Sequence, residues 1–180
     1  GYWNEIFETL GEAKIPQNQA TLAHLIKTKL YESFETVEEI CVRADKEYSL
    51  KVRFNEVVMK TLNECTVEIL EYKTTGTFIL GDTMPLQQLF DDQFNAIVMM
   101  KQNAFIKPIK AEVEQTENKL IYFQNLLDSW IKCQRGWMYL EPIFSSDEMK
   151  TEMPQEREYF VTVDENWRKI MSFIQESPLI

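Results

Sequence analysis

Only a few residues carry side chains that could act as a nucleophile, a base or a metal ligand. His24 is the single histidine and could serve as a general base, and Cys133 could serve as a nucleophile. His24 stands without the His-Glu-x-x-His pattern of a zinc enzyme. Cys41, Cys65 and Cys133 are odd in number and widely separated, which favours buried thiols of a reducing compartment over disulfides or a zinc site. We interpret all four as structural residues.

Pairs of acidic residues and a phosphate-binding loop would be the other routes to chemistry. The acidic pairs are Glu38-Glu39, Asp91-Asp92 and Asp147-Glu148. Adjacent residues on a helix point about 100° apart, so such pairs do not converge on one substrate. Gly76 and Gly81 flank a predicted strand but lack the Gly-Lys-Ser/Thr sequence that cradles phosphates. We therefore predict no catalytic residue, metal ligand or cofactor in this chain.

The densest group of large apolar side chains lies between residues 130 and 144. Its members are Trp130, Trp137, Tyr139, Leu140, Ile143 and Phe144. Helical spacing explains most of them as core residues, while Trp and Tyr are also the residues that dominate protein interfaces. A predicted β-hairpin upstream adds two further aromatic residues. The candidate interface residues are Trp137, Tyr139, Phe144, Tyr72 and Phe78.

Composition narrows the classes of partner. The chain has 180 residues, 44% of them hydrophobic and 12% aromatic, which is typical of an ordered globular protein. Its net charge of −10 disfavours nucleic acid and anionic lipid as partners. The longest apolar run, Ala96 to Met100, is far shorter than the roughly 20 residues of a membrane-spanning helix.

Most of the chain has the apolar spacing of α-helices, so these residues are expected to be positioned mainly by helices. A short helix opens the chain, and two helices separated by a break at Tyr48-Ser49 are expected to follow. Pro85 can begin another helix, and Pro108 can begin the longest one, of about 34 residues or about 50 Å, with apolar residues near a seven-residue repeat. We expect this helix to end before Pro142. Met153-Pro154 interrupts the pattern ahead of a last helix.

Residues 65–82 differ from the rest in having strand periodicity. Val67, Ile69 and Tyr72 lead to a turn at residues 73–76, and Phe78 to Leu80 follow before Gly81-Asp82. Gly76 can adopt the positive φ of a tight turn, so this segment is predicted to be one β-hairpin. A lone hairpin is marginally stable in water and must therefore pack on helices or on another protein.

The predicted fold is mainly α, an elongated helical bundle with one β-hairpin and a long central helix. We divide it into an N-terminal helical subdomain (1–64), the hairpin (65–82) and a long-helix bundle (83–180). The chain begins at Gly1 without Met and ends on the apolar residues 177–180. Both ends lead us to expect an excised fragment of a much larger chain.

Several segments together resemble the linker region of dynein heavy chains. The most specific is residues 130–146, WIKCQRGWMYLEPIFSS, and its LEPIF sequence is closer to the axonemal heavy chains than to the cytoplasmic ones. Further support comes from RADKEYSL (43–50), YKTTGTFIL (72–80), LFDDQ (89–93) and FVTVDENW (160–167). These segments cover nearly the whole chain in order.

The resemblance implies a mechanical role. In that family the linker is a helical lever arm across a ring of ATPase modules, and it bends with the nucleotide state of the ring. ATP and Mg would be bound in that ring and not in this chain, whose partners would be the ring of the same heavy chain and other dynein subunits. No direct contact with the microtubule is expected, since both surfaces are acidic. The place of action would be the cytoplasmic cytoskeleton, in the axoneme of a cilium or flagellum.

Two alternatives remain open from the sequence. A helical scaffold or tethering domain unrelated to dynein would have similar long amphipathic helices, although a regular three-helix repeat would lack the hairpin. A small hydrolase would need side chains that converge in a pocket. The breaks at Tyr48-Ser49, Gln102 to Lys107 and Met153-Pro154 are the candidate hinges of a lever.

Overall fold

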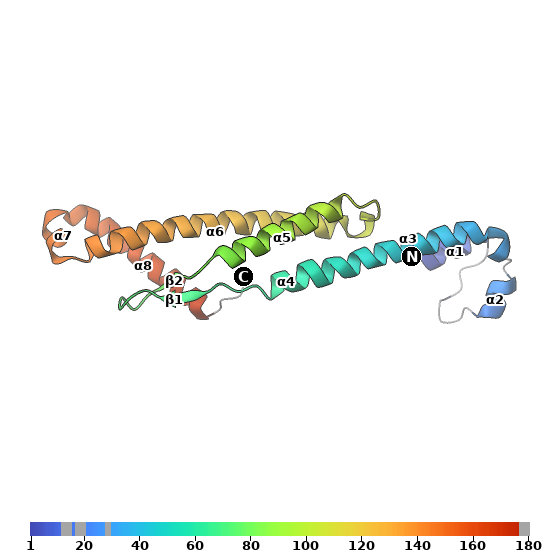
Figure 1. Ribbon diagram of the computed structural model, residues 1–180, viewed down its shortest axis with the longest axis horizontal. Coiled ribbons are helices and arrows are strands. Elements are labelled where there is room, and N and C mark those ends of the chain that lie inside the picture. The colour runs from blue at the N-terminus through green and yellow to red at the C-terminus, as the bar shows by residue number, and fades with distance from the viewer. Residues whose placement is uncertain (12–15, 17–20, 28–29, 177–180) are drawn as a thin grey trace.

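Helical periodicity in the sequence is matched by a mainly helical, elongated molecule with one hairpin, as predicted (Figure 1). The computed structural model describes residues 1–11, 16, 21–27 and 30–176, so the apolar end at 177–180 lies outside the described residues. The elements, with η2 and η4 as 3₁₀ turns and η3 as a π-helix, are α1 (Tyr2–Thr9), α2 (Leu22–Lys27), η2 (Leu30–Ser33), α3 (Phe34–Arg53), η3 (Phe54–Met59), α4 (Lys60–Asn63), β1 (Ile69–Glu71), β2 (Phe78–Leu80), α5 (Met84–Lys101), η4 (Lys107–Ile109), α6 (Lys110–Phe144), α7 (Asp147–Glu152) and α8 (Pro154–Glu176).

The expected break at Tyr48-Ser49 is wrong, because α3 passes through it and continues into η3 and α4 without interruption. The apolar pattern shifts there because the helix changes partner. Val37 and Ile40 are buried beside α1, whereas Leu50 and Phe54 belong to the central core. The wide π-helical turn that follows is a local change of helical pitch, not a helix end.

The start of α3 packs against α1 in a small core of its own. Phe7 of α1 is fully buried, and Ile6 lies beside Val37 and Ile40 of α3. Nη2 of Arg43 donates to both carboxylate oxygens of Glu5 at 2.5 Å. This N-terminal arm, α1 with the first half of α3, projects beyond the ends of α5 and α6 (Figure 1).

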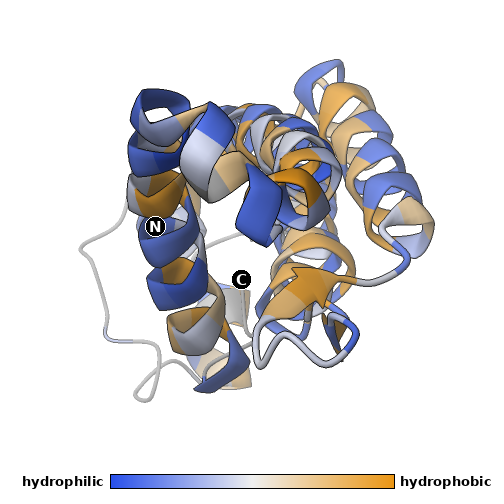
Figure 2. Ribbon diagram, turned by 90° about the vertical axis from the view of Figure 1, so that its left-hand side faces the viewer, coloured by the Kyte–Doolittle hydropathy of each residue, from blue (hydrophilic) through white to orange (hydrophobic). Residues whose placement is uncertain are grey.

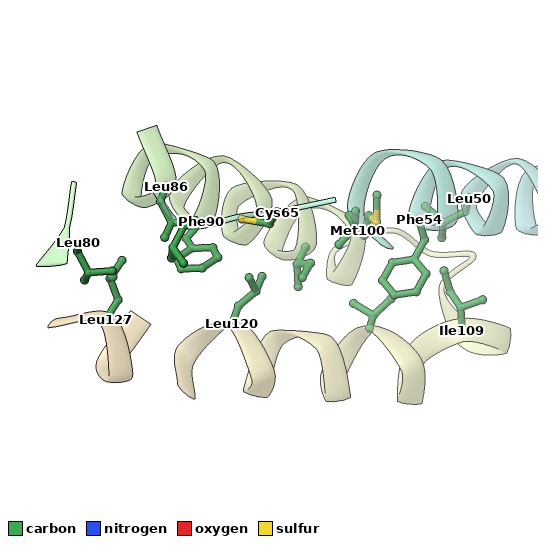
Figure 3. Close-up of a cluster of buried hydrophobic side chains, with 14 residues drawn as sticks. Leu50, Phe54, Cys65, Leu80, Leu86, Phe90, Met100, Ile109, Leu120 and Leu127 are labelled. Atoms are coloured by element: carbon green, nitrogen blue, oxygen red, sulfur yellow. The ribbon is translucent and has the colours of Figure 1, made fainter. Parts of the chain in front are cut away.

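The central core forms where α5 and η3 pack over α6. Figure 3 shows Phe90 and Met100 of α5 and Phe54 of η3 facing Leu120 of α6 and Ile109 of η4. Seen end on, the helices show apolar and polar residues alternating along the ribbon, as amphipathic helices do (Figure 2). The long helix is confirmed, and its 35 residues correspond to about 52 Å at a rise of about 1.5 Å per residue.

Pro142 lies inside α6, so the prediction that the helix ends before it is wrong. A proline in the last turn removes one backbone hydrogen bond and crowds the carbonyl four residues before it, yet the helix continues to Phe144. Packing holds the helix together beyond this point, because the ring of Phe144 stacks on Phe160 of α8 with centroids 5.3 Å apart. The predicted interruption at Met153-Pro154 is confirmed as the boundary between α7 and α8.

The hairpin is confirmed, with β1 and β2 antiparallel in the register Ile69↔Leu80, Leu70↔Ile79 and Glu71↔Phe78. Tyr72 N donates to Thr77 O at 2.8 Å and closes the four-residue turn. Lys73 and Gly76 in this turn have φ of 51° and 67°. Glycine adopts that conformation without strain, which explains its place in the turn. The division into 1–64, 65–82 and 83–180 stays a prediction.

Elongation can be measured in solution by small-angle X-ray scattering. A compact globule of this length would have a radius of gyration of about 16 Å. We expect a clearly larger radius for the folded monomer, because α6 and the N-terminal arm lie end to end along the molecule (Figure 1). The radius should not change across a dilution series, which excludes self-association as the cause. A radius near 16 Å in a folded monomer would contradict the extended arrangement.

Candidate functional site at the hairpin junction

The residues with potential for chemistry do not come together in the structure. His24 lies on the exposed helix α2, and its Nδ1 is 2.9 Å from Thr21 Oγ1. Among the described residues, no group of three or more His, Cys, Asp or Glu side chains is placed to hold a metal ion. In the same part of the chain, no helix is both long and apolar enough to cross a membrane.

The cysteines differ from the prediction of three buried thiols. Cys65 is buried in the central core, whereas Cys41 and Cys133 are exposed. Burial raises the pKa of the Cys65 thiol. The thiolate is the nucleophilic form, so Cys65 is the least reactive of the three.

One glutamine of α6 forms hydrogen bonds to the backbone of the hairpin. Leu80 N donates to Gln134 Oε1 at 2.7 Å, and Gln134 Nε2 donates to Leu80 O at 3.0 Å. The carboxamide therefore pairs with the free backbone edge of β2 as a residue of a third strand would. Nothing in the residue spacing of the long helix indicates this pairing.

Aromatic side chains fill the space between the hairpin, α6 and α8. Trp137 of α6 is 2% exposed and stacks on Trp167 of α8, with ring centroids 5.4 Å apart and planes 16° apart. Tyr72, at the end of β1, meets Trp137 edge to face at 5.2 Å. Such pairs add roughly 0.5–1.5 kcal/mol to the burial of the rings. Three elements distant in sequence thus share one aromatic cluster.

Asp164 and Arg168 complete this junction with polar contacts. Trp137 Nε1 donates to Asp164 Oδ1 at 3.0 Å, and Arg168 Nε donates to Asp164 Oδ2 at 2.8 Å. Arg168 Nη1 also donates to Thr75 O at 2.8 Å in the hairpin turn. Sequence analysis did not identify either residue as part of a site, although their four-residue spacing on a helix is the usual spacing of an ion pair.

Of the five candidate interface residues, Tyr72 and Trp137 are buried inside this junction. Phe78 and Phe144 are half-buried and pack against the same cluster. Tyr139 alone is well exposed, at 71%. Four of the five therefore share one core, and the junction is a structural joint that holds β2, α6 and α8 together. Contact of any of the five with a partner stays a prediction.

A cavity of about 550 Å³ lies between α4 and α6, away from the junction. Its lining is largely apolar and includes Met59, Leu62, Phe90, Leu120 and Phe123. Thr116 Oγ1 donates to Glu112 O, as a helical threonine commonly does. No group of ionisable side chains converges in this cavity.

Replacing Gln134 by Ala should loosen the hairpin. Leu80 N and Leu80 O would lose their side-chain partner, and the loss of two partly buried hydrogen bonds should cost about 1–3 kcal/mol of unfolding free energy. Urea unfolding measures this cost. Gln115→Ala is the matched control, since Gln115 is exposed on the same helix. Equal unfolding free energies for the two variants would contradict the role of Gln134.

Alkylation should separate the three cysteines. Iodoacetamide should modify Cys41 and Cys133 readily and Cys65 slowly, because burial raises the pKa of the Cys65 thiol and lowers access to it. A thiol pKa raised by folding stabilises the folded state below the unfolded pKa of about 8.5. That contribution is lost as the pH rises above this value. Mass spectrometry across pH 7 to 10 gives the rates, and similar rates at all three sites would contradict the burial of Cys65.

The whole chain is similar to a known protein family. The family described as Dynein heavy chain, N-terminal region 2, matches residues 1–180. Dynein axonemal heavy chain 12 of Homo sapiens is 36% identical over 179 residues, which cover 99% of this chain and 6% of that protein. The corresponding figures for Rattus norvegicus are 35%, 99% and 6%.

A second axonemal relative gives similar values. Dynein axonemal heavy chain 3 of Homo sapiens is 37% identical over 171 residues, which cover 95% of this chain and 4% of that protein. The chain thus spans only a small part of the length of the curated relatives that it matches. The match to the family extends over the whole sequence and confirms the resemblance to dynein heavy chains. This chain therefore belongs to the family of the N-terminal region 2 of dynein heavy chains.

Proposed function

We propose that this chain is a non-catalytic part of the linker, or lever arm, of an axonemal dynein heavy chain. In this role it transmits an ATP-driven change of the motor ring into movement along microtubules. The observation that carries the proposal is the family match over residues 1–180 together with relatives that are themselves axonemal heavy chains. The place of action is then the axoneme of a cilium or flagellum, within the cytoskeleton of the cytoplasm.

Stiffness is the first property that a lever needs, and two long helices supply it. Twenty residues of α3 run without interruption into η3 and α4, and α6 has 35 residues. The central core joins them, so that a force on one helix is carried by packed side chains to the other. The hairpin junction fixes α8 to α6 in the same way at the far end of the molecule.

A lever also needs places where it bends. Helix α3 is continuous at Tyr48-Ser49, which removes this candidate hinge. The loop between α5 and η4, in the Gln102 to Lys107 segment, and the Met153-Pro154 boundary remain as candidates, because each interrupts the helical hydrogen bonding. The π-helix η3 is a third candidate, since π-helical turns are frequent at functional sites.

The partner of the lever is the ATPase ring of the same heavy chain, where ATP and Mg are bound in this proposal, and other dynein subunits are further partners. The described residues offer no metal cluster of their own. A net charge of −10 disfavours direct contact with the acidic microtubule wall. Tyr139 is the exposed member of the candidate interface residues and is the first one to test for contact with the ring.

The test uses a complete axonemal heavy chain that carries this sequence. Gln134→Ala loosens the junction, and Gln115→Ala is the control on the same helix. A lever loosened at the junction should keep most of its ATPase activity while the microtubule gliding velocity falls, because the force is transmitted less completely. ATPase rate and gliding velocity are measured in parallel on the same preparation.

Two outcomes would contradict the lever. A Gln134 variant that glides at the velocity of the control shows that the junction transmits no force. A variant with normal motor activity that fails to join its dynein complex favours the alternative, a helical scaffold or tethering domain. Analytical gel filtration of the complex separates assembly from motor function.

A further inference from the structure

Helix α8 carries a second row of apolar side chains that the rest of the described chain does not cover. Tyr159, Val163, Ile170 and Phe173 are 76%, 47%, 53% and 73% exposed. The buried row of the same helix, Phe160, Trp167 and Met171, faces α6 and the hairpin. One amphipathic helix that packs on a single partner needs one apolar stripe, so the second row is in excess of what this fold uses.

The spacing of the exposed row is that of a coiled-coil seam. Tyr159, Val163, Asn166, Ile170 and Phe173 follow one another at intervals of four, three, four and three residues. These are the intervals of alternating a and d positions, and they keep the side chains on one line along the helix. Asn166 is exposed in the middle of the row. A single Asn in such a seam sets the register of the partner helix. We call these five residues the α8 seam.

Charge next to the seam indicates the chemistry of the partner. The side of α8 that borders the seam away from α6 carries Glu158, Glu165 and Glu176 against Lys169. The whole chain is also acidic, at −10. A second copy of this chain would bring the same acidic flank and the same net charge, which repel. A helix with basic residues beside its apolar stripe is complementary to this surface.

We propose that the α8 seam is the docking site of an amphipathic helix whose apolar stripe is flanked by lysine or arginine. The partner helix lies along α8 on the face about 100° around the helix from the aromatic cluster, because Asn166 and Ile170 directly precede the buried Trp167 and Met171. Two neighbouring apolar faces of α8 are then covered. This proposal goes beyond the lever function and does not depend on it. The seam can bind a helix whether or not the chain transmits force, and the binding test below does not use motor activity.

The test uses the 180-residue chain and a synthetic four-heptad helical peptide as the probe. The peptide has leucine at its a and d positions and lysine at the flanking positions, and a sister peptide has glutamate there instead. We expect the lysine peptide to bind and the glutamate peptide to bind at least tenfold more weakly. Fluorescence anisotropy of the labelled peptide gives both dissociation constants.

Whether the lysine peptide binds at the α8 seam is tested with variants that keep the net charge of the chain unchanged. The double variant Ile170→Ser with Phe173→Ser should weaken binding of the lysine peptide at least tenfold, because it removes the apolar contacts and keeps every charge. Val42→Ser with Tyr48→Ser is the matched control, since these residues are exposed at similar levels on α3. Both variants change exposed side chains, and circular dichroism checks that each remains helical.

Three results would overturn the proposal. Equal binding of the lysine peptide to the seam variant and to the control variant would show attraction by general charge only. Equal dissociation constants for the lysine and glutamate peptides would contradict the proposal that the partner helix is basic. Sedimentation that shows a dimer of the chain, lost in the seam variant, would assign the seam to a second copy instead.

Discussion

The free backbone edge of β2 is the constraint on which the junction depends. A two-stranded hairpin is at best marginally stable in water, because its outer edges lack partners and its faces lack a core. Gln134 satisfies both the N–H and the C=O of Leu80, and the aromatic cluster covers the face that carries Tyr72. The hairpin therefore exists as an ordered element only because α6 and α8 are positioned to receive it.

This dependence is mutual, because the hairpin also fixes the two helices. Arg168 of α8 reaches Thr75 in the turn, and Asp164 of the same helix binds Trp137 of α6. The short connection through α7 would by itself leave α8 free to pivot at Met153. Contacts at the hairpin turn, which is far from that connection in sequence, supply the second point of attachment. Two separated attachments define the direction of a helix, whereas one does not.

Local signals in the sequence predicted most of the elements but not the contacts between them. Gly76 between β-branched and aromatic residues indicated the hairpin, and Pro108 with a long apolar stripe indicated α6. The break expected at Tyr48 was wrong because one helix packs on two partners in succession, and the resulting shift in the apolar pattern resembles a helix end when a single partner is assumed. In the sequence, Gln134 is indistinguishable from any other helical glutamine. It binds the hairpin only because β2 lies next to it in the fold. A contact between two distant segments does not change the spacing of residue types within either segment, so the pattern of one segment cannot predict it.

The two apolar faces of α8 place it between the junction and the proposed partner. Trp167, on its buried face, stacks on Trp137, and Ile170 and Phe173 are exposed on the neighbouring face, within two turns of Trp167. A rigid helix cannot move on one face and stay fixed on the other. A helix bound at the α8 seam would therefore act on the stacked tryptophans, on Asp164 and, through Arg168, on the hairpin turn. In a lever this arrangement makes α8 the element through which a partner at the outer surface would reach the central helix α6.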